Sequence, residues 1–177
     1  MSLGGALAEA NRLLESADPD REERLLELCA RDLGQAFGSD DALQVAVLRL
    51  IDGEEFTFAW PRELRPGNRF PVGPSLAGRA LRSGALIENA VPKRPHFGLY
   101  ERIPRAGAPA APIQRMLALP IPGVDGPLGV VQVSRAGHTP EAAGPGFTGA
   151  DADRLVAGLE RWAPLLARLW KTPTAQS

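Results

Sequence analysis

Two β-rich runs joined by a short turn stand in the second half of the chain. Residues 113–121 are IQRMLALPI and residues 127–134 are PLGVVQVS, with Gly123-Val-Asp-Gly126 between them. Glycine and aspartate between two β-rich runs are typical of a hairpin turn. The segment therefore predicts an antiparallel pair of strands.

A second hairpin is predicted upstream. Residues 43–51 are β-rich and residues 54–60 alternate in polarity, with an Asp-Gly pair between the two runs. Alternation along a strand places Phe56, Phe58 and Trp60 on one face. We expect core packing for the two phenylalanines. Trp60 ends its strand and is expected either in the core or at the rim of a pocket.

Helices are predicted at both ends of the chain. Residues 5–17 are weakly helical, and an Asp-Pro-Asp cluster at 18–20 precedes a second helix that Asp18 or Asp20 would cap. The last helix begins at Thr148-Gly-Ala-Asp151, which resembles a capping box, and continues to about Trp170. Apolar residues recur at three- and four-residue spacing in both main helices, which predicts one buried stripe on each.

The middle of the chain alternates short elements with loops. Ser75 can cap a helix over 76–83, and a strand is predicted over 85–89. Residues 61–74 and 90–112 are rich in proline, glycine and arginine and are predicted as loops. The order of helices, hairpins and loops predicts an α+β fold with a single sheet layer.

Four segments, taken in order, resemble the GAF domain family. They are VGPSLAGRALRSGALIEN at 72–89, IQRMLALPI at 113–121, GPLGVVQVS at 126–134 and FTGAD at 147–151. The resemblance implies a central antiparallel sheet of order 2-1-5-4-3, counting the predicted strands along the chain. The N- and C-terminal helices would cover one face, and a pocket-covering helix and loop layer the other. The implied organisation is an N-terminal helical extension (1–19), a GAF-like domain (20–170) and a disordered tail (171–177).

The resemblance also implies a function. GAF domains mostly bind small molecules as sensory modules and often form homodimers through their terminal helices. The chain would therefore be a stand-alone regulatory sensor in signal transduction that acts on a separate output protein. Bilin attachment and methionine sulfoxide reduction need pocket thiols, and the one cysteine, Cys29, lies on a helical stripe. We expect no enzyme activity, no cofactor and no metal site, because the sequence has no thiol set, metal cluster or catalytic carboxylate pair.

Charge is distributed unevenly along the chain. Residues 1–60 have a net charge of −8, residues 61–115 of +7 and residues 116–177 of zero. The total of −1 excludes nucleic-acid binding driven by bulk charge. The basic segment favours three interpretations: scattered solvated arginines, contacts to an anionic ligand, or docking of an acidic surface.

Seven residues are candidates for ligand contact: Trp60, Phe70, Ser75, His96, Phe97, Tyr100 and Arg115. The aromatic cluster at 96–100 lies in the long predicted loop, where it would form a ligand wall or merely anchor the loop. The alternative function is a protein–protein adaptor with a degenerate pocket, which would expose an apolar stripe at Trp162, Leu166 and Trp170.

Two further expectations concern the cellular compartment of the protein and the burial of its cysteine. No run of 18 apolar residues and no signal peptide is visible, which predicts a cytoplasmic protein that does not enter a membrane. Cys29 shares its stripe with leucines and is expected to be a buried small hydrophobe.

Overall fold

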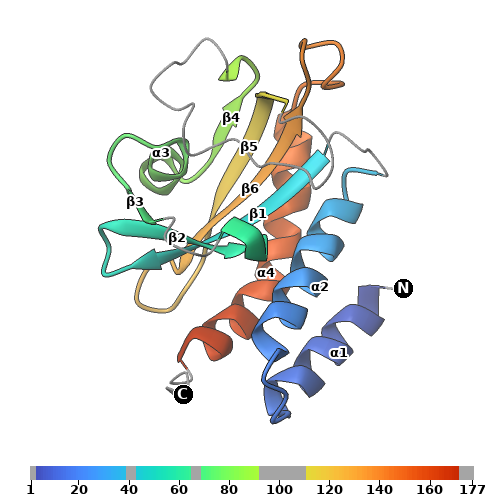
Figure 1. Cartoon of the computed structure of the whole chain (residues 1–177), viewed down its shortest axis with the longest axis vertical. Helices are drawn as coiled ribbons and strands as arrows, with labels where there is room; N and C mark the ends of the chain where they lie inside the picture. Colours follow the sequence, from blue (N-terminus) through green and yellow to red (C-terminus); the bar gives the residue numbers. More distant parts are fainter. Residues whose placement is uncertain (1–2, 39–42, 65–68, 92–110, 172–177) are drawn as a thin grey trace.

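The computed structural model describes residues 3–38, 43–64, 69–91 and 111–171. Within these ranges the strands form one antiparallel sheet of order β3-β2-β1-β6-β5-β4 (Figure 1). The strands are β1 (Leu43–Ile51), β2 (Glu55–Trp60), β3 (Arg69–Pro71), β4 (Leu86–Glu88), β5 (Ile113–Ile121) and β6 (Gly129–Ala136).

The predicted strand order is confirmed, with one strand added. The five predicted strands correspond to β1, β2, β4, β5 and β6, and their order matches 2-1-5-4-3. The added strand, β3, lies in a segment predicted as a loop and pairs with the outer edge of β2, where Phe70 stands opposite Phe56. A three-residue strand between proline-rich turns carries too little periodicity to be predicted.

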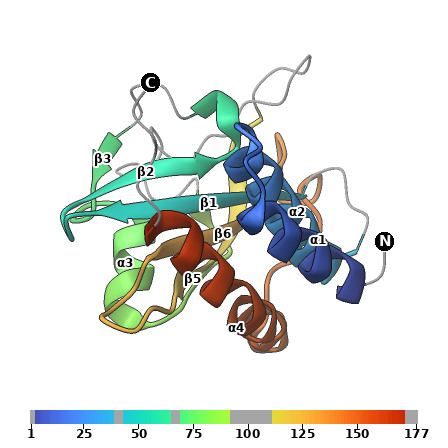
Figure 2. The same cartoon turned by 90° about the horizontal axis from the view of Figure 1, so that it is seen from below.

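Three helices pack on one face of the sheet and form what we call the helix layer. They are α1 (Leu3–Glu15), α2 (Arg21–Gln35) and α4 (Gly149–Lys171). Figures 1 and 2 show them on the side of the sheet opposite to α3. Their buried leucines meet Val47, Leu117, Val131 and Val133 of the sheet in one apolar cluster. The N- and C-terminal helices therefore cover one face of the sheet, as expected.

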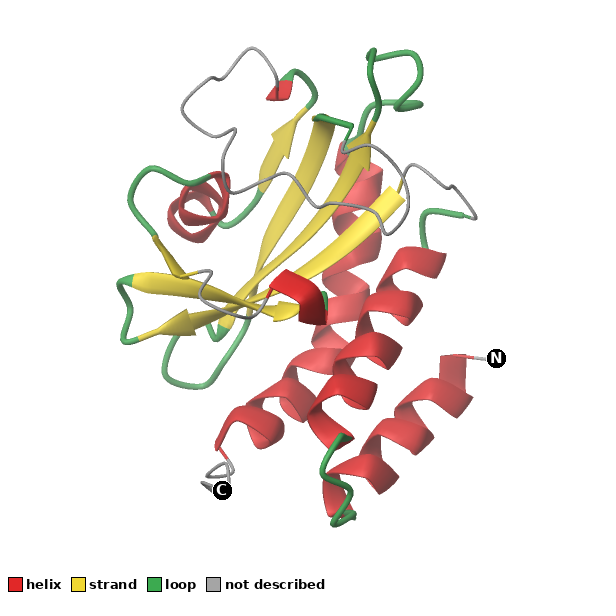
Figure 3. Ribbon diagram, in the orientation of Figure 1, coloured by secondary structure: helices red, strands yellow, loops and turns green. Residues whose placement is uncertain are grey.

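The other face is covered by the short helix α3 (Leu76–Ser83), and we call it the α3 face (Figure 3). A second apolar cluster lies here, in which Leu76, Ala77 and Ala80 of α3 pack against the sheet. A turn of 3-10 helix, η1 (Arg62–Leu64), follows β2. The sheet thus separates two cores that share its strands.

The aromatic stripe of α4 points inward. Trp162 and Leu166 are fully buried and Trp170 is partly buried against the helix-layer cluster. The stripe that an adaptor function would expose is therefore part of the core. α4 continues through Pro164, which lies on the exposed side of the helix and has no N–H to donate to Glu160.

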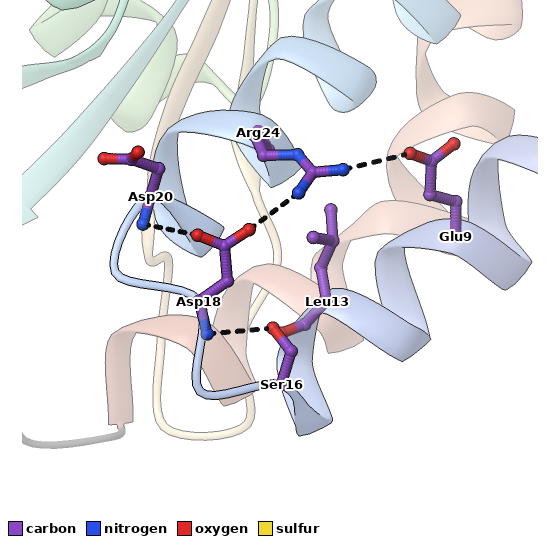
Figure 4. A network of polar contacts seen from close by, with 6 residues as sticks. All are labelled: Glu9, Leu13, Ser16, Asp18, Asp20 and Arg24. Atoms are coloured by element: carbon purple, nitrogen blue, oxygen red, sulfur yellow. Dashed lines mark hydrogen bonds and ion pairs between the residues drawn. The ribbon is translucent and has the colours of Figure 1, made fainter.

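Helix α1 is attached to α2 by a small polar network (Figure 4). Arg24 forms ion pairs with Asp18 (Nη1–Oδ2, 2.6 Å) and with Glu9 (Nη2–Oε1, 3.8 Å). Asp20 occupies the N-cap of α2 but makes no side-chain capping bond; its N–H instead donates to Asp18. That hydrogen bond, followed by the one from Arg24, holds the pKa of Asp18 below its usual 3.8.

Candidate functional site

Phe70, one of the predicted ligand contacts, lies in the core of the α3 face. Its ring centroid is 5.6 Å from those of both Phe56 and Phe58. The side chain is buried. It joins β3 to β2 and forms part of the apolar floor beneath η1 and α3.

Ser75 begins α3 and uses its hydroxyl within the chain. The oxygen accepts a hydrogen bond from the Gly78 N–H (2.9 Å), and the hydroxyl donates to the Val72 carbonyl (3.1 Å). The backbones approach so closely that a Cβ on Gly78 would lie 1.7 Å from the Val72 oxygen. The predicted cap is confirmed, and it positions α3 over the sheet.

Trp60 lies on the helix-layer face, which corrects the predicted alternation. The register between β1 and β2 shifts so that Leu48 pairs with Phe58 and Val47 pairs with Trp60. Residues directly opposite each other share a face, and Val47 belongs to the helix-layer cluster. This β-bulge turns Trp60 away from the side that Phe56 and Phe58 occupy.

Arg115 also lies on the helix-layer face. It stands opposite Arg135 in the β5–β6 pair, and the Arg135 guanidinium sits 4.9 Å from the ring of Phe147 in the helix-layer cluster. The Nη2 of Arg115 donates to the carbonyl of Pro140 (3.2 Å). Arg115 therefore does not share the α3 face with Phe70, because alternation along β5 gives that face to Met116 and Ala118.

The rest of the basic segment is partly described. Ion pairs join Arg62 to Glu23, Arg69 to Glu55 and Arg79 to Glu88. Arg82 donates to the carbonyl of Gly73 (3.2 Å). His96, Phe97 and Tyr100 lie outside the described residues, so the aromatic loop cluster stays a prediction.

Three neutral polar residues that sequence analysis missed lie on the α3 face, and we call them the polar row. Gln44 on β1 stands opposite Ser134 on β6, and Gln132 stands between Ala46 and Ala118 on the neighbouring strands. Only 3% of Gln132 and 1% of Ser134 are exposed. The alternation in VVQVS already puts Gln132 and Ser134 on one face, so the signal was present in the sequence.

The described ranges can be checked for a metal site, for a membrane-spanning helix and for a reactive thiol. No group of three His, Cys, Asp or Glu side chains within them could hold a metal ion. No helix there is both long and apolar enough to cross a bilayer. Cys29 is fully buried in the helix layer, and burial strongly raises the pKa of its thiol. A buried neutral thiol is a poor nucleophile and a poor redox group.

Comparison with solved structures identifies the architecture. The GAF domain of the Acinetobacter phosphoenolpyruvate-protein phosphotransferase is similar over 99% of this chain and 100% of its own length, with a TM-score of 0.65 and 15% identity. The chain has the GAF fold. The corresponding domain from Coxiella burnetii is similar over 94% of this chain and 93% of its own (TM-score 0.63, 15% identity). The GAF domain/HD domain protein from Geobacter sulfurreducens is similar over 90% and 99% (TM-score 0.59, 15% identity).

No family model matches the chain, and no curated protein sequence does. The likeness therefore concerns the GAF fold. Several of the similar structures are GAF domains of regulatory proteins, among them a two-component sensor histidine kinase from Bacillus halodurans (14% identity, 96% of this chain, 97% of that chain, TM-score 0.54). GAF domains are typically sensory or regulatory. In this chain the GAF sheet has one face under α3 and the other under the helix layer.

Proposed function

We propose that the chain is a sensory GAF domain that binds a small molecule on the α3 face and performs no chemistry of its own. The observation that carries the proposal is the polar row, in which Gln132 and Ser134 are buried beside a largely apolar cluster. Ligand pockets combine an apolar lining with a few placed polar groups. The GAF fold supports the same function.

The proposal includes a route from the ligand to the helix layer. Side chains along β6 alternate, so Gln132 lies on the α3 face while its neighbours Val131 and Val133 belong to the helix-layer cluster. A ligand that moves β6 would therefore change the packing of the helix layer. Arg49 on β1 strengthens this link, because its Nη2 donates to the Trp170 carbonyl (3.3 Å) near the end of α4.

Homodimerisation through the helix layer is part of the proposal. The exposed side of α4 carries charges of both signs, with Asp153, Arg154, Glu160, Arg161 and Arg168. A dimer formed through such a surface weakens as salt screens the charges. Sedimentation velocity at low and high salt tests this part, and a monomer at every concentration and salt level contradicts it.

Ligand binding is tested by thermal-shift screening of the full chain against small neutral and anionic molecules. Binding to the folded state alone raises the melting temperature in a concentration-dependent way. The proposal expects at least one such molecule, and a ligand-dependent change in hydrogen exchange of the helix layer. A protein whose melting temperature no small molecule changes contradicts a sensory function.

A further inference from the structure

The polar row places hydrogen-bonding groups on the two central strands of the sheet, on the α3 face. Gln44 on β1 stands opposite Ser134 on β6. Gln132 lies two residues before Ser134 on the same strand and therefore on the same face. Buried polar side chains in proteins almost always have hydrogen-bond partners. Departures from that rule therefore point to a group that is missing.

Two atoms of the row depart from it. Gln44 Oε1 and Gln132 Nε2 are buried, and neither has a hydrogen-bond partner among the described residues. One is an acceptor and the other a donor. The side-chain amide of each glutamine has both an NH2 group that donates and a carbonyl oxygen that accepts. A molecule that satisfied both glutamines would therefore need a donor and an acceptor of its own.

Short side chains flank Gln132 on the α3 face. The residues directly opposite it on the adjacent strands are Ala46 and Ala118, both with side chains of a single carbon. Val130 and Met116 extend the apolar face around the row. Small residues on both sides of one long polar side chain give a floor on which a compact ligand can rest.

Among the described residues, one acidic and one basic side chain lie next to each other on this face. Glu88 stands opposite Met116 on the α3 side, and its carboxylate lies 4.0 Å from the Arg79 guanidinium of α3. Arg115, the cation expected at the ligand, lies on the other face of the sheet. Neutral amides without an adjacent unbalanced cation favour an uncharged ligand, because transferring an anion to a buried site without a counter-charge is costly.

We infer that the α3 face binds a small neutral molecule with both a hydrogen-bond donor and an acceptor, of the carboxamide class. The inference rests on the proposed function and names the chemistry of its ligand. Gln132 Nε2 donates to the ligand carbonyl, and Gln44 Oε1 accepts from the ligand N–H. Ala46 and Ala118 contact its apolar part.

Matched amide and carboxylate pairs test the inference directly. Thermal shift and calorimetric titration of the full chain are compared for acetamide and acetate, malonamide and malonate, and nicotinamide and nicotinate. Each pair keeps its shape and changes its charge. We expect the amide of at least one pair to raise the melting temperature more than its carboxylate.

Two glutamine variants separate recognition from folding. Gln132→Met keeps a linear side chain and removes the amide, so we expect about tenfold weaker amide binding and unliganded stability that is unchanged or higher. Gln114→Met is the matched control, because the buried Gln114 amide donates to the Gly137 carbonyl (2.8 Å). That variant should lower the melting temperature and keep amide binding. Gln44→Met provides a second test should Gln132→Met fail to fold.

The outcomes distinguish the inference from the proposed function. Stronger stabilisation by carboxylates than by amides overturns the inference and leaves ligand sensing in place. Amide binding that Gln132→Met and Gln44→Met both leave unchanged overturns it too. Stabilisation by no member of any pair, while another small molecule does stabilise the protein, overturns the carboxamide assignment alone. Stabilisation by no small molecule at all overturns both.

Discussion

The Trp162 indole on α4 donates a hydrogen bond of 2.7 Å to the carboxylate of Asp32 on α2, and both side chains are buried. An indole N–H can only donate and an ionised carboxylate can only accept, so the two groups are complementary hydrogen-bond partners. The two residues are 130 positions apart in the sequence, so the hydrogen bond joins two helices that are distant along the chain. It fixes how α2 and α4 sit against each other in the helix layer.

Breaking this pair should destabilise the protein from either side. Asp32→Ala leaves a buried indole N–H without an acceptor, and Trp162→Phe leaves a buried carboxylate without its donor. We expect each to lower the free energy of unfolding by about 2 kcal/mol or more. Urea denaturation measures the loss, and a double-mutant cycle should give a coupling of about 1 kcal/mol or more.

Asp153→Ala is the matched control, because Asp153 is exposed on α4. We expect its effect to stay within about 0.5 kcal/mol. If Asp32→Ala behaved like Asp153→Ala, the hydrogen bond would not hold the two helices together.

The start of α3 depends on a glycine. Alanine at Gly78 would bring its Cβ within 1.7 Å of the Val72 carbonyl oxygen, so the segment that holds α3 must shift. We expect Gly78→Ala to lower the free energy of unfolding by about 3 kcal/mol. Gly73→Ala, five positions earlier, meets nothing within 4 Å and should change it by about 0.5 kcal/mol or less. Equal stability of the two variants in denaturant titrations would contradict the close approach.

The start of α4 should be sensitive to acid. Burial acts to raise the pKa of Asp151, but hydrogen bonds from Thr148 and the Arg154 charge hold it below 3.8. A carboxyl whose pKa is lower in the folded state stabilises the fold above pH 3.8, and this contribution is lost as the pH falls through the folded pKa.

We therefore expect Asp151→Ala to cost about 1 kcal/mol at neutral pH. The difference from the parent protein should narrow below pH 3.8. Denaturant titrations across the acidic range measure this difference. A gap that stays constant with pH would show that the ionised carboxylate has no part in capping α4. Asp153→Ala again serves as the control, with little effect at either end of the range.

Cys29 should resist modification while the protein is folded. The thiol is fully buried, and burial raises its pKa, so little thiolate is accessible at pH 8. We expect Ellman's reagent to react in proportion to the unfolded fraction across a urea series. Complete reaction within minutes in the absence of denaturant would contradict the burial of this face of α2.

The elements with strong local signals were predictable from the sequence. The hairpins, the Ser75 cap and the inward stripes of α2 and α4 follow from turn residues and periodicity, and the structure has them all. The capping box at Thr148 and Asp151 is also confirmed by reciprocal hydrogen bonds.

The side of the sheet on which Trp60 lies was not predictable. One extra residue in β2 opposite Val47 and Leu48 reverses the alternation, and no local signal marks where such a bulge falls. Arg115 is different, since alternation with Met116 along β5 assigns it to the helix-layer face. Its basic neighbours in the sequence suggested a shared site, but nearness along a strand does not place side chains on one face.

Hydrogen–deuterium exchange of the full chain, with and without the small molecule that stabilises it most, shows on which face of the sheet a ligand binds. We expect slower exchange in α3, β1 and β6 and, across the sheet, altered exchange in α2 and α4. Exchange that changes only in the helix layer, or in no part of the chain, would contradict a sensor whose ligand binds on the α3 face.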